Sequence, residues 1–65
     1  MTVRYDVFND VGAYVREGDK LVSFRGEVVT FIECAHPRKI YVENPNGTRG
    51  EYYPGVFNVR IEEVR

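Results

Sequence analysis

The sequence predicts an all-β fold built from short strands. No window of eleven or more residues keeps the i, i+3, i+4 apolar spacing of an amphipathic helix. Apolar and polar residues instead alternate over short runs, as they do in half-buried strands. Glycine, proline and asparagine interrupt these runs at close intervals, which is typical of turns between strands. We therefore expect a small sheet protein without long helices.

The first expected strand lies at the N-terminus, where Val3, Tyr5 and Val7 share one face of an alternating run. Asn9-Asp10 and Gly12 then turn the chain. We interpret residues 1–16 as an additional strand or arm, outside the five strands predicted for residues 17–65. Such an arm either covers its own chain or adds to the sheet edge of another chain.

Five strands are expected after this arm: residues 20–24, 27–33, 39–44, 48–53 and a last strand from residue 57. The second of them is the most β-prone run in the chain and is predicted to be central. Alternation predicts a core that includes the following inward residues: Val22, Phe24, Val29, Phe31, Ile40, Val42, Phe57, Val59 and Ile61.

The expected connections follow from the turn residues. Arg25-Gly26 predicts a tight turn or bulge. Residues 34–39 are expected to leave the sheet, because Pro37 cannot donate a ladder hydrogen bond. Asn46-Gly47 predicts a type I′ hairpin with Gly47 at positive φ. Residues 54–56, which begin with a proline, predict a short 3₁₀ turn that carries the chain from one sheet to the other.

Length and cysteine content limit how the domain is stabilised. A single domain of 65 residues buries only about 60% of the surface of its unfolded chain, so its stability margin is thin. Cys34 is the only cysteine, which excludes a disulfide within the chain. Cys34 and His36 alone do not make a zinc site. We therefore expect an efficient β core, self-association or both, and we expect no metal and no cofactor.

Charge and hydropathy argue against two classes of protein, the nucleic-acid binder and the membrane protein. The net charge is −1, with nine basic and ten acidic residues interleaved, whereas a dedicated nucleic-acid binder of this size shows a basic surplus. No stretch approaches the roughly 20 apolar residues of a membrane span, and the N-terminus has no apolar signal segment. One unpaired cysteine fits a reducing compartment, so the expected location is cytoplasmic.

Three segments carry a resemblance to SH3-like small β-barrels: residues 18–22, 46–50 and 53–59. The chain resembles, in particular, short stand-alone barrels encoded by phages and plasmids, which act as accessory or inhibitory proteins. This resemblance implies a five-stranded barrel over residues 18–64 and a non-catalytic protein-interaction module. The length and the Tyr53-Pro54 pair are also similar to type II dihydrofolate reductases, in which residues 50–53 would match a Val-Gln-Ile-Tyr run. Two alternatives therefore remain: a nucleic-acid-associated barrel and an oligomeric enzyme of that reductase type.

Tyrosines provide the main candidate binding surface. Tyrosine tolerates a partly solvent-exposed position and is enriched at interfaces. The five tyrosines cannot all enter so small a core. Tyr52 and Tyr53 are adjacent, so one faces inward and the other outward, and the sequence leaves open which. We expect a Tyr-rich surface with an arginine rim that contacts another protein or a second copy of the chain, formed by Tyr5, Tyr14, Arg38, Tyr41, Arg49, Tyr52 and Tyr53. The alternative is that some of these tyrosines only cap the ends of the barrel.

Two smaller clusters are weaker candidates. Cys34 and His36 share a face on an extended strand, and a thiol beside an imidazole can act as a nucleophile with its base. The simpler expectation is a buried cysteine and a surface histidine. The basic run from His36 to Lys39 could touch phosphate, although one such loop supplies few of the contacts that backbone binding needs.

Overall fold

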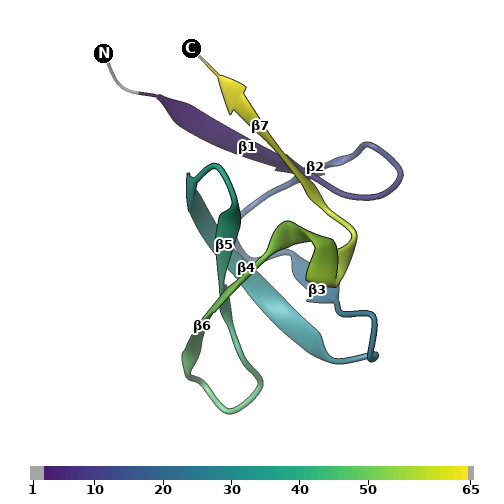
Figure 1. Cartoon of the computed structure of the whole chain (residues 1–65). Coiled ribbons are helices and arrows are strands. Elements are labelled where there is room, and N and C mark those ends of the chain that lie inside the picture. Colours follow the sequence, from purple (N-terminus) through teal and green to yellow (C-terminus); the bar gives the residue numbers. More distant parts are fainter. Residues whose placement is uncertain (1–2, 65) are drawn as a thin grey trace.

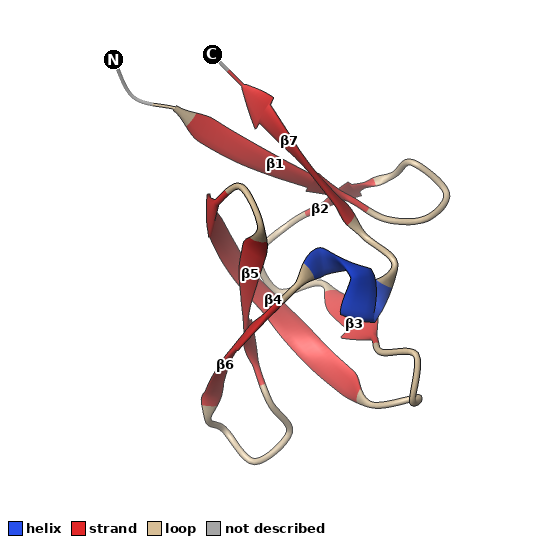
Figure 2. Cartoon of the chain, in the orientation of Figure 1, coloured by secondary structure: helices blue, strands red, loops and turns tan. Residues whose placement is uncertain are grey.

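A computed structural model describes residues 3–64, and it is all-β with two antiparallel sheets (Figure 1). One sheet has the strand order β2-β1-β7 and the other has the order β3-β4-β5-β6. The elements are β1 (Arg4–Phe8), β2 (Tyr14–Val15), β3 (Lys20–Val22), β4 (Val28–His36), β5 (Lys39–Glu43), β6 (Arg49–Tyr52), the 3₁₀ helix η1 (Pro54–Phe57) and β7 (Arg60–Val64). Within the described residues, strand pairing does not join the two sheets into a closed barrel. Figure 2 shows η1 as the only helical segment of that part of the chain.

The N-terminal strand packs on its own chain. β1 is the middle strand of its sheet and pairs with β7 from Arg4↔Val64 to Phe8↔Arg60. β2 lies on its other side, with Val7 opposite Val15. Val7 is only 1% exposed, because it points from this sheet into the core. Of the two alternatives left open for the additional strand in residues 1–16, the described part of that segment therefore covers its own chain.

β4 is longer than expected and continues through Cys34 to His36. Its pairing with β5 shifts register on both sides of Glu33, and such bulges bend a strand without ending it. The prediction that the chain leaves the sheet at Cys34 is wrong. Pro37 stands in the two-residue turn between His36 and Lys39, where its missing N–H breaks no ladder bond.

The core lies between the two sheets and contains nine buried apolar residues: Val7, Val15, Leu21, Val29, Phe31, Ile40, Val42, Phe57 and Val59. Ile61, which was predicted inward, is half-buried and packs against this cluster. The inward placements of Val22 and Phe24 are wrong, since these residues are 55% and 71% exposed. The reason is that Leu21 is the inward residue of β3, so alternation turns Val22 outward, and Ser23 then begins a turn.

Three turns in the structure share one hydrogen-bond pattern, in segments 9–13, 23–27 and 44–48. In each, the first N–H donates to the fifth carbonyl, and the fourth N–H donates to the first carbonyl. The fourth residue is always a glycine at positive φ, with φ values of 83°, 85° and 86° at Gly12, Gly26 and Gly47. This geometry is a β-turn followed by a left-handed residue, and it closes a hairpin over a three-residue loop.

The hairpin at residues 44–48 is therefore confirmed, as is the positive φ of Gly47, but the type I′ assignment is wrong. A type I′ turn needs positive φ at Asn46, and Asn58 is the only non-glycine residue among residues 3–64 with positive φ. Pro45 provides the physical reason. A two-residue loop would need the N–H of residue 45 for pairing, and proline has none.

The corner before the last strand is a 3₁₀ helix, as predicted. Tyr53 is extended, Pro54 begins η1, and the Val56 N–H donates to the Tyr53 carbonyl at 3.1 Å. Asn58 ends the helix in the left-handed region at φ 55°. The chain then enters β7 in the other sheet, so this corner connects the two sheets.

We predict that Gly47→Val lowers the free energy of unfolding by on the order of 1 kcal/mol or more, because a β-branched residue is strained at positive φ. Thermal and urea unfolding measure the change. Gly47→Asn is the matched control. Its free energy of unfolding should fall less than that of Gly47→Val, since asparagine tolerates the left-handed region. Equal stability of Gly47→Val and the wild type would contradict the turn geometry.

Candidate functional site

The outer face of β5 and β6 brings two of the predicted tyrosines together. Tyr41 lies opposite Glu51 in the ladder, so Tyr53, two residues after Glu51, is its diagonal neighbour on the same face. Tyr53 is 64% exposed, whereas Tyr41 is half-buried. The sequence left open which of the two adjacent tyrosines faces outward. In the structure Tyr53 faces outward and Tyr52 faces inward.

Tyr52 belongs to the interior side of β6. Its ring packs edge-on against Phe57 with 5.4 Å between the ring centroids, and its hydroxyl donates to Asn44 Oδ1 at 3.2 Å. The ring also covers Gly50, where an added Cβ would lie 2.6 Å from the Tyr52 ring. Tyr52 is thus held on three sides and extends the core instead of joining the exposed tyrosines.

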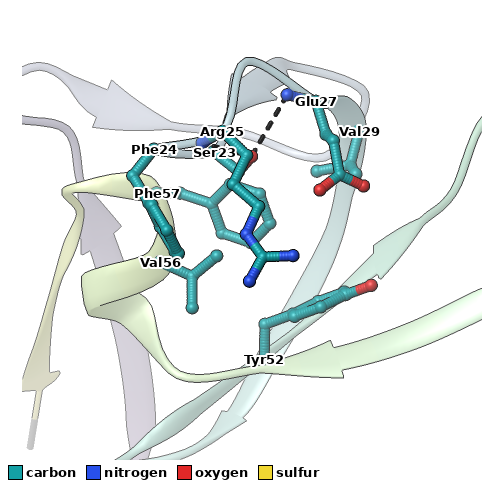
Figure 3. Close-up of a pocket in the computed structure, with 8 residues that line it drawn as sticks. All are labelled: Ser23, Phe24, Arg25, Glu27, Val29, Tyr52, Val56 and Phe57. Carbon is teal, nitrogen blue, oxygen red and sulfur yellow. Dashed lines mark hydrogen bonds between the residues drawn. The ribbon is translucent and has the colours of Figure 1, made fainter.

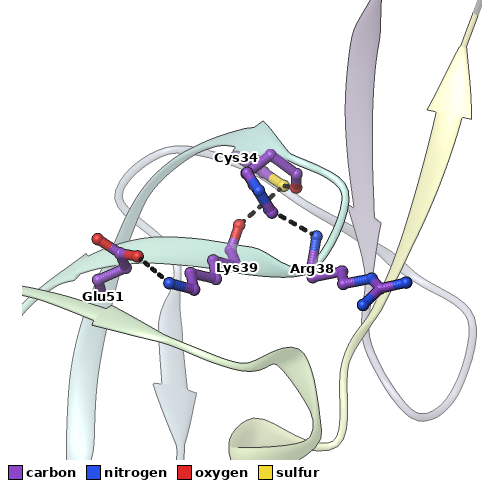
Figure 4. A network of polar contacts seen from close by, with 5 residues as sticks. Cys34, Arg38, Lys39 and Glu51 are labelled. Atoms are coloured by element: carbon purple, nitrogen blue, oxygen red, sulfur yellow. Dashed lines mark hydrogen bonds and ion pairs between the residues drawn. The ribbon is translucent and has the colours of Figure 1, made fainter.

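Charged side chains lie beside both outward tyrosines. The Arg49 guanidinium lies 4.6 Å from the centre of the Tyr41 ring and 3.1 Å from the Glu33 carboxylate. The Lys39 ammonium lies 5.9 Å from the centre of the Tyr53 ring and 2.8 Å from the Glu51 carboxylate (Figure 4). This outer face is therefore a network of opposite charges with two aromatic rings within it, and not a bare aromatic patch.

The Lys39–Glu51 ion pair shifts the pKa of both side chains. Its hydrogen bond and charge raise the pKa of Lys39 and lower the pKa of Glu51. A carboxyl whose pKa is lowered by folding stabilises the fold above its unfolded pKa, and this stabilisation disappears as the pH falls through the folded pKa. A lysine whose pKa is raised loses its contribution as the pH rises through its folded pKa. Both groups are exposed, so solvent screening keeps the effect on stability small.

Three residues of the predicted surface lie elsewhere. Tyr5 is in β1 opposite Glu63, and Tyr14 is in β2 with its ring centre 5.8 Å from that of Phe8. Arg38 is in the β4–β5 turn, where its backbone N–H donates to His36 Nδ1 at 3.0 Å. The structure therefore divides the seven predicted residues between two sheets and a turn, and only Tyr41, Arg49 and Tyr53 share one face.

Cys34 and His36 do not form a thiol–imidazole pair. The Cys34 thiol donates to the backbone carbonyls of His36 and Lys39, at 3.1 and 3.4 Å. The His36 imidazole instead accepts the Arg38 backbone N–H at Nδ1. Burial raises the pKa of this thiol, against a weaker opposite effect of the His36 backbone. A protonated, hydrogen-bonded thiol is a poor nucleophile, so Cys34 has a structural role at the β4–β5 turn.

A second site, which the sequence reasoning missed, is an apolar hollow between the turn at residues 23–27 and η1. The hollow has a volume of about 230 Å³ and is open to solvent (Figure 3). It is lined by Ser23, Phe24, Arg25, Glu27, Val29, Tyr52, Val56 and Phe57. We call this set of residues the Phe24 hollow. Val29 and Phe57 belong to the buried core, so the hollow opens directly onto core residues.

Backbone contacts hold Phe24 beside this hollow. The Phe24 N–H donates to the Val56 carbonyl at 3.0 Å, which attaches the turn to η1. The Ser23 hydroxyl accepts the N–H groups of Arg25 and Glu27, at 3.2 and 3.1 Å. The Ser-x-x-Gly pattern of this turn is the sequence signal for the exposed ring. The turn ends the strand before Phe24 and so leaves the Phe24 ring outside the core.

Charged groups lie at the opening of the Phe24 hollow. The Arg25 guanidinium lies 5.5 Å from the centre of the Phe24 ring and reaches over the hollow in Figure 3. The Glu27 carboxylate lines the same space. The site therefore combines an apolar interior with one cation and one anion, which is an arrangement that suits an amphipathic ligand.

Comparison with protein-family models, curated protein sequences and solved structures finds no match to this chain. No helix in residues 3–64 has the length and apolar character needed to cross a membrane. Within the same residues, no group of three or more His, Cys, Asp or Glu side chains is placed to hold a metal ion.

We predict that Lys39→Met raises the pKa of Glu51 towards its usual value, because the ammonium group that lowers it is removed. A titration of the Glu51 carboxyl carbon followed by NMR measures this pKa directly. Lys20→Met is the matched control, since Lys20 hydrogen-bonds Thr30 and not Glu51. An unchanged Glu51 pKa in Lys39→Met would contradict the ion pair.

Proposed function

We propose that this chain is a non-catalytic protein-interaction module that binds a partner through the Phe24 hollow. The observation that carries the proposal is the position of Phe24, a large aromatic residue that is 71% exposed beside an apolar hollow. A chain of 65 residues has few apolar side chains to spare for its core. The Phe24 ring adjoins the apolar lining of the hollow, and contiguous exposed apolar surface is typical of interaction sites.

The chemistry of the hollow supports a peptide segment with one large apolar side chain next to an acidic residue. Apolar cavities of roughly 150 Å³ accept a benzene ring, so a hollow of about 230 Å³ has room for a leucine or phenylalanine side chain. An adjacent carboxylate would pair with Arg25, and the Glu27 carboxylate would accept a backbone N–H of the ligand. A rigid turn lowers the entropy that such binding costs.

The arrangement of elements supports an SH3-like barrel as the scaffold for this module. The first and last described strands pair with each other, four hairpin-connected strands form the second sheet, and a 3₁₀ helix precedes the last strand. The resemblance to short phage and plasmid barrels with accessory or inhibitory roles agrees with a binding function. Function still rests on the site, since one fold serves many functions.

The outer face of β5 and β6 is the second candidate surface. Tyr53 is 64% exposed there, and charged residues that include Lys39 and Arg49 surround it. This pattern of an aromatic residue within a polar rim is common at interfaces. The Phe24 hollow is favoured because the cations of the other face are already paired with Glu33 and Glu51.

The experiment is a selection of random peptides displayed on phage against the folded wild-type protein. We expect the selected peptides to share a Leu, Phe or Trp next to Asp or Glu. Their affinity should fall about tenfold or more for Phe24→Ala, as for truncation of an interface anchor. Phe24→Ala should keep its fold by circular dichroism, because the ring is mostly outside the core.

Tyr53→Ala is the matched control, since it removes an aromatic ring of similar exposure from the other face. Selected peptides that bind Phe24→Ala as tightly as the wild type would contradict the proposed site. If the same peptides are lost with Tyr53→Ala instead, the outer face of β5 and β6 is the binding surface.

A further inference from the structure

β6 is the edge strand of its sheet. The order β3-β4-β5-β6 gives it one neighbour, β5, and no strand among residues 3–64 pairs with its other side. An unpaired edge presents backbone N–H and C=O groups that are able to pair with another chain.

The hairpin fixes which backbone groups of β6 point to this edge. The Asn44 N–H donates to the Thr48 carbonyl at 2.8 Å, so residues 44 and 48 form a hydrogen-bonded pair. Hydrogen-bonded and non-hydrogen-bonded pairs alternate along an antiparallel ladder. Arg49 opposite Glu43 and Glu51 opposite Tyr41 are consequently non-hydrogen-bonded pairs. The N–H and C=O groups of Arg49 and Glu51 therefore point away from β5.

We propose that two copies of this chain associate by antiparallel pairing of their β6 edges, with Gly50 opposite Gly50 of the second copy. In this register Arg49 of each copy lies opposite Glu51 of the other. These are the residues whose backbone groups face the edge, so each such pair exchanges both N–H···O bonds. The two-fold axis through Gly50 makes the contact self-complementary and closed.

The side chains agree with this register. Arg49 and Glu51 are two residues apart on one strand, so both project from the same outer face. The pairing places the guanidinium of one copy beside the carboxylate of the other, and opposite charges directly across two strands are favourable. The ion pairs of Arg49 with Glu33 and of Glu51 with Lys39 then become parts of one alternating network across the axis.

The ends of β6 limit this contact to a dimer of defined length. Pro54 has no N–H to continue the ladder past Tyr53. At the other end, the chain turns at Gly47, whose N–H already donates to the Asn44 carbonyl at 2.9 Å. The carbonyl of Tyr53, the next residue that faces this edge, already accepts the Val56 N–H at 3.1 Å. Arg49 and Glu51 are therefore the residues of β6 whose N–H and C=O groups both face a partner strand. A second copy suits them, because two-fold pairing sets each cation of one copy opposite an anion of the other.

Two charge-reversal variants and their mixture test this register. Arg49→Glu gives a chain with glutamate at positions 49 and 51, and Glu51→Arg gives a chain with arginine at both. Each variant alone places like charges opposite each other, so we expect its self-association constant to fall about tenfold or more relative to the wild type. An equimolar mixture places opposite charges at both positions, and it should dimerise to within about threefold of the wild type.

Sedimentation equilibrium over a range of protein concentrations gives the association constants, and circular dichroism checks that each variant is folded. Glu17→Arg is the matched control, because it reverses an exposed turn carboxylate and should dimerise like the wild type. Hydrogen exchange gives a second readout, since the Arg49 and Glu51 amides should become protected as the protein concentration rises.

Three outcomes would overturn the proposal. The first is a wild-type protein that stays monomeric at millimolar concentration. The second is a mixture of Arg49→Glu and Glu51→Arg that associates no better than either variant alone. The third is a wild-type dimer in which the Arg49 and Glu51 amides remain unprotected, which would place the interface elsewhere. Loss of peptide binding in Phe24→Ala does not bear on these results, because Phe24 is on the turn beside η1.

Discussion

The constraint on which the rest of this structure depends is one small core that both sheets must share. Nine buried side chains form it, and Ile40 and Val42 at its centre have no exposed surface. Val7 and Val15 enter it from the β2-β1-β7 sheet, while Leu21, Val29 and Phe31 enter from the other sheet. Neither sheet has enough apolar residues to bury its own inner face alone. The β1–β7 pair is therefore part of the fold, and the corner at η1 keeps it on the second sheet.

This limited core also decides where the binding surfaces arise. Phe31 and Phe57 fill the available space, so the remaining large rings lie at the margin or outside. Tyr52 closes one side of the core through Phe57 and Asn44, and its ring becomes a wall of the Phe24 hollow. On the opposite side of the same strand, alternation points charged residues outward. β6 thus connects the proposed peptide site with the proposed dimer edge.

Local sequence signals predicted much of the fold. The all-β class, the hairpin at Gly47, the 3₁₀ corner at Pro54 and most of the core follow from alternation and turn residues, which act over a few positions. The errors arose where tertiary contacts decide. The exposure of Phe24 depends on a strand that ends two residues earlier than its β-propensity suggests, and the extension of β4 to His36 depends on bulges. The division of the tyrosines between two sheets required the pairing of the first and last strands, which no local pattern contains.

Native-state hydrogen exchange is the most direct test of the claim that both sheets share one core. We expect the slowest amides of β1 and β7 and those of β4 and β5 to exchange through the same global opening, with free energies that agree within roughly 0.5 kcal/mol. Amides of β1 and β7 that exchange through a separate opening, at least about 2 kcal/mol less costly, would contradict it. That result would make the N- and C-terminal strands an independent layer on a self-sufficient second sheet.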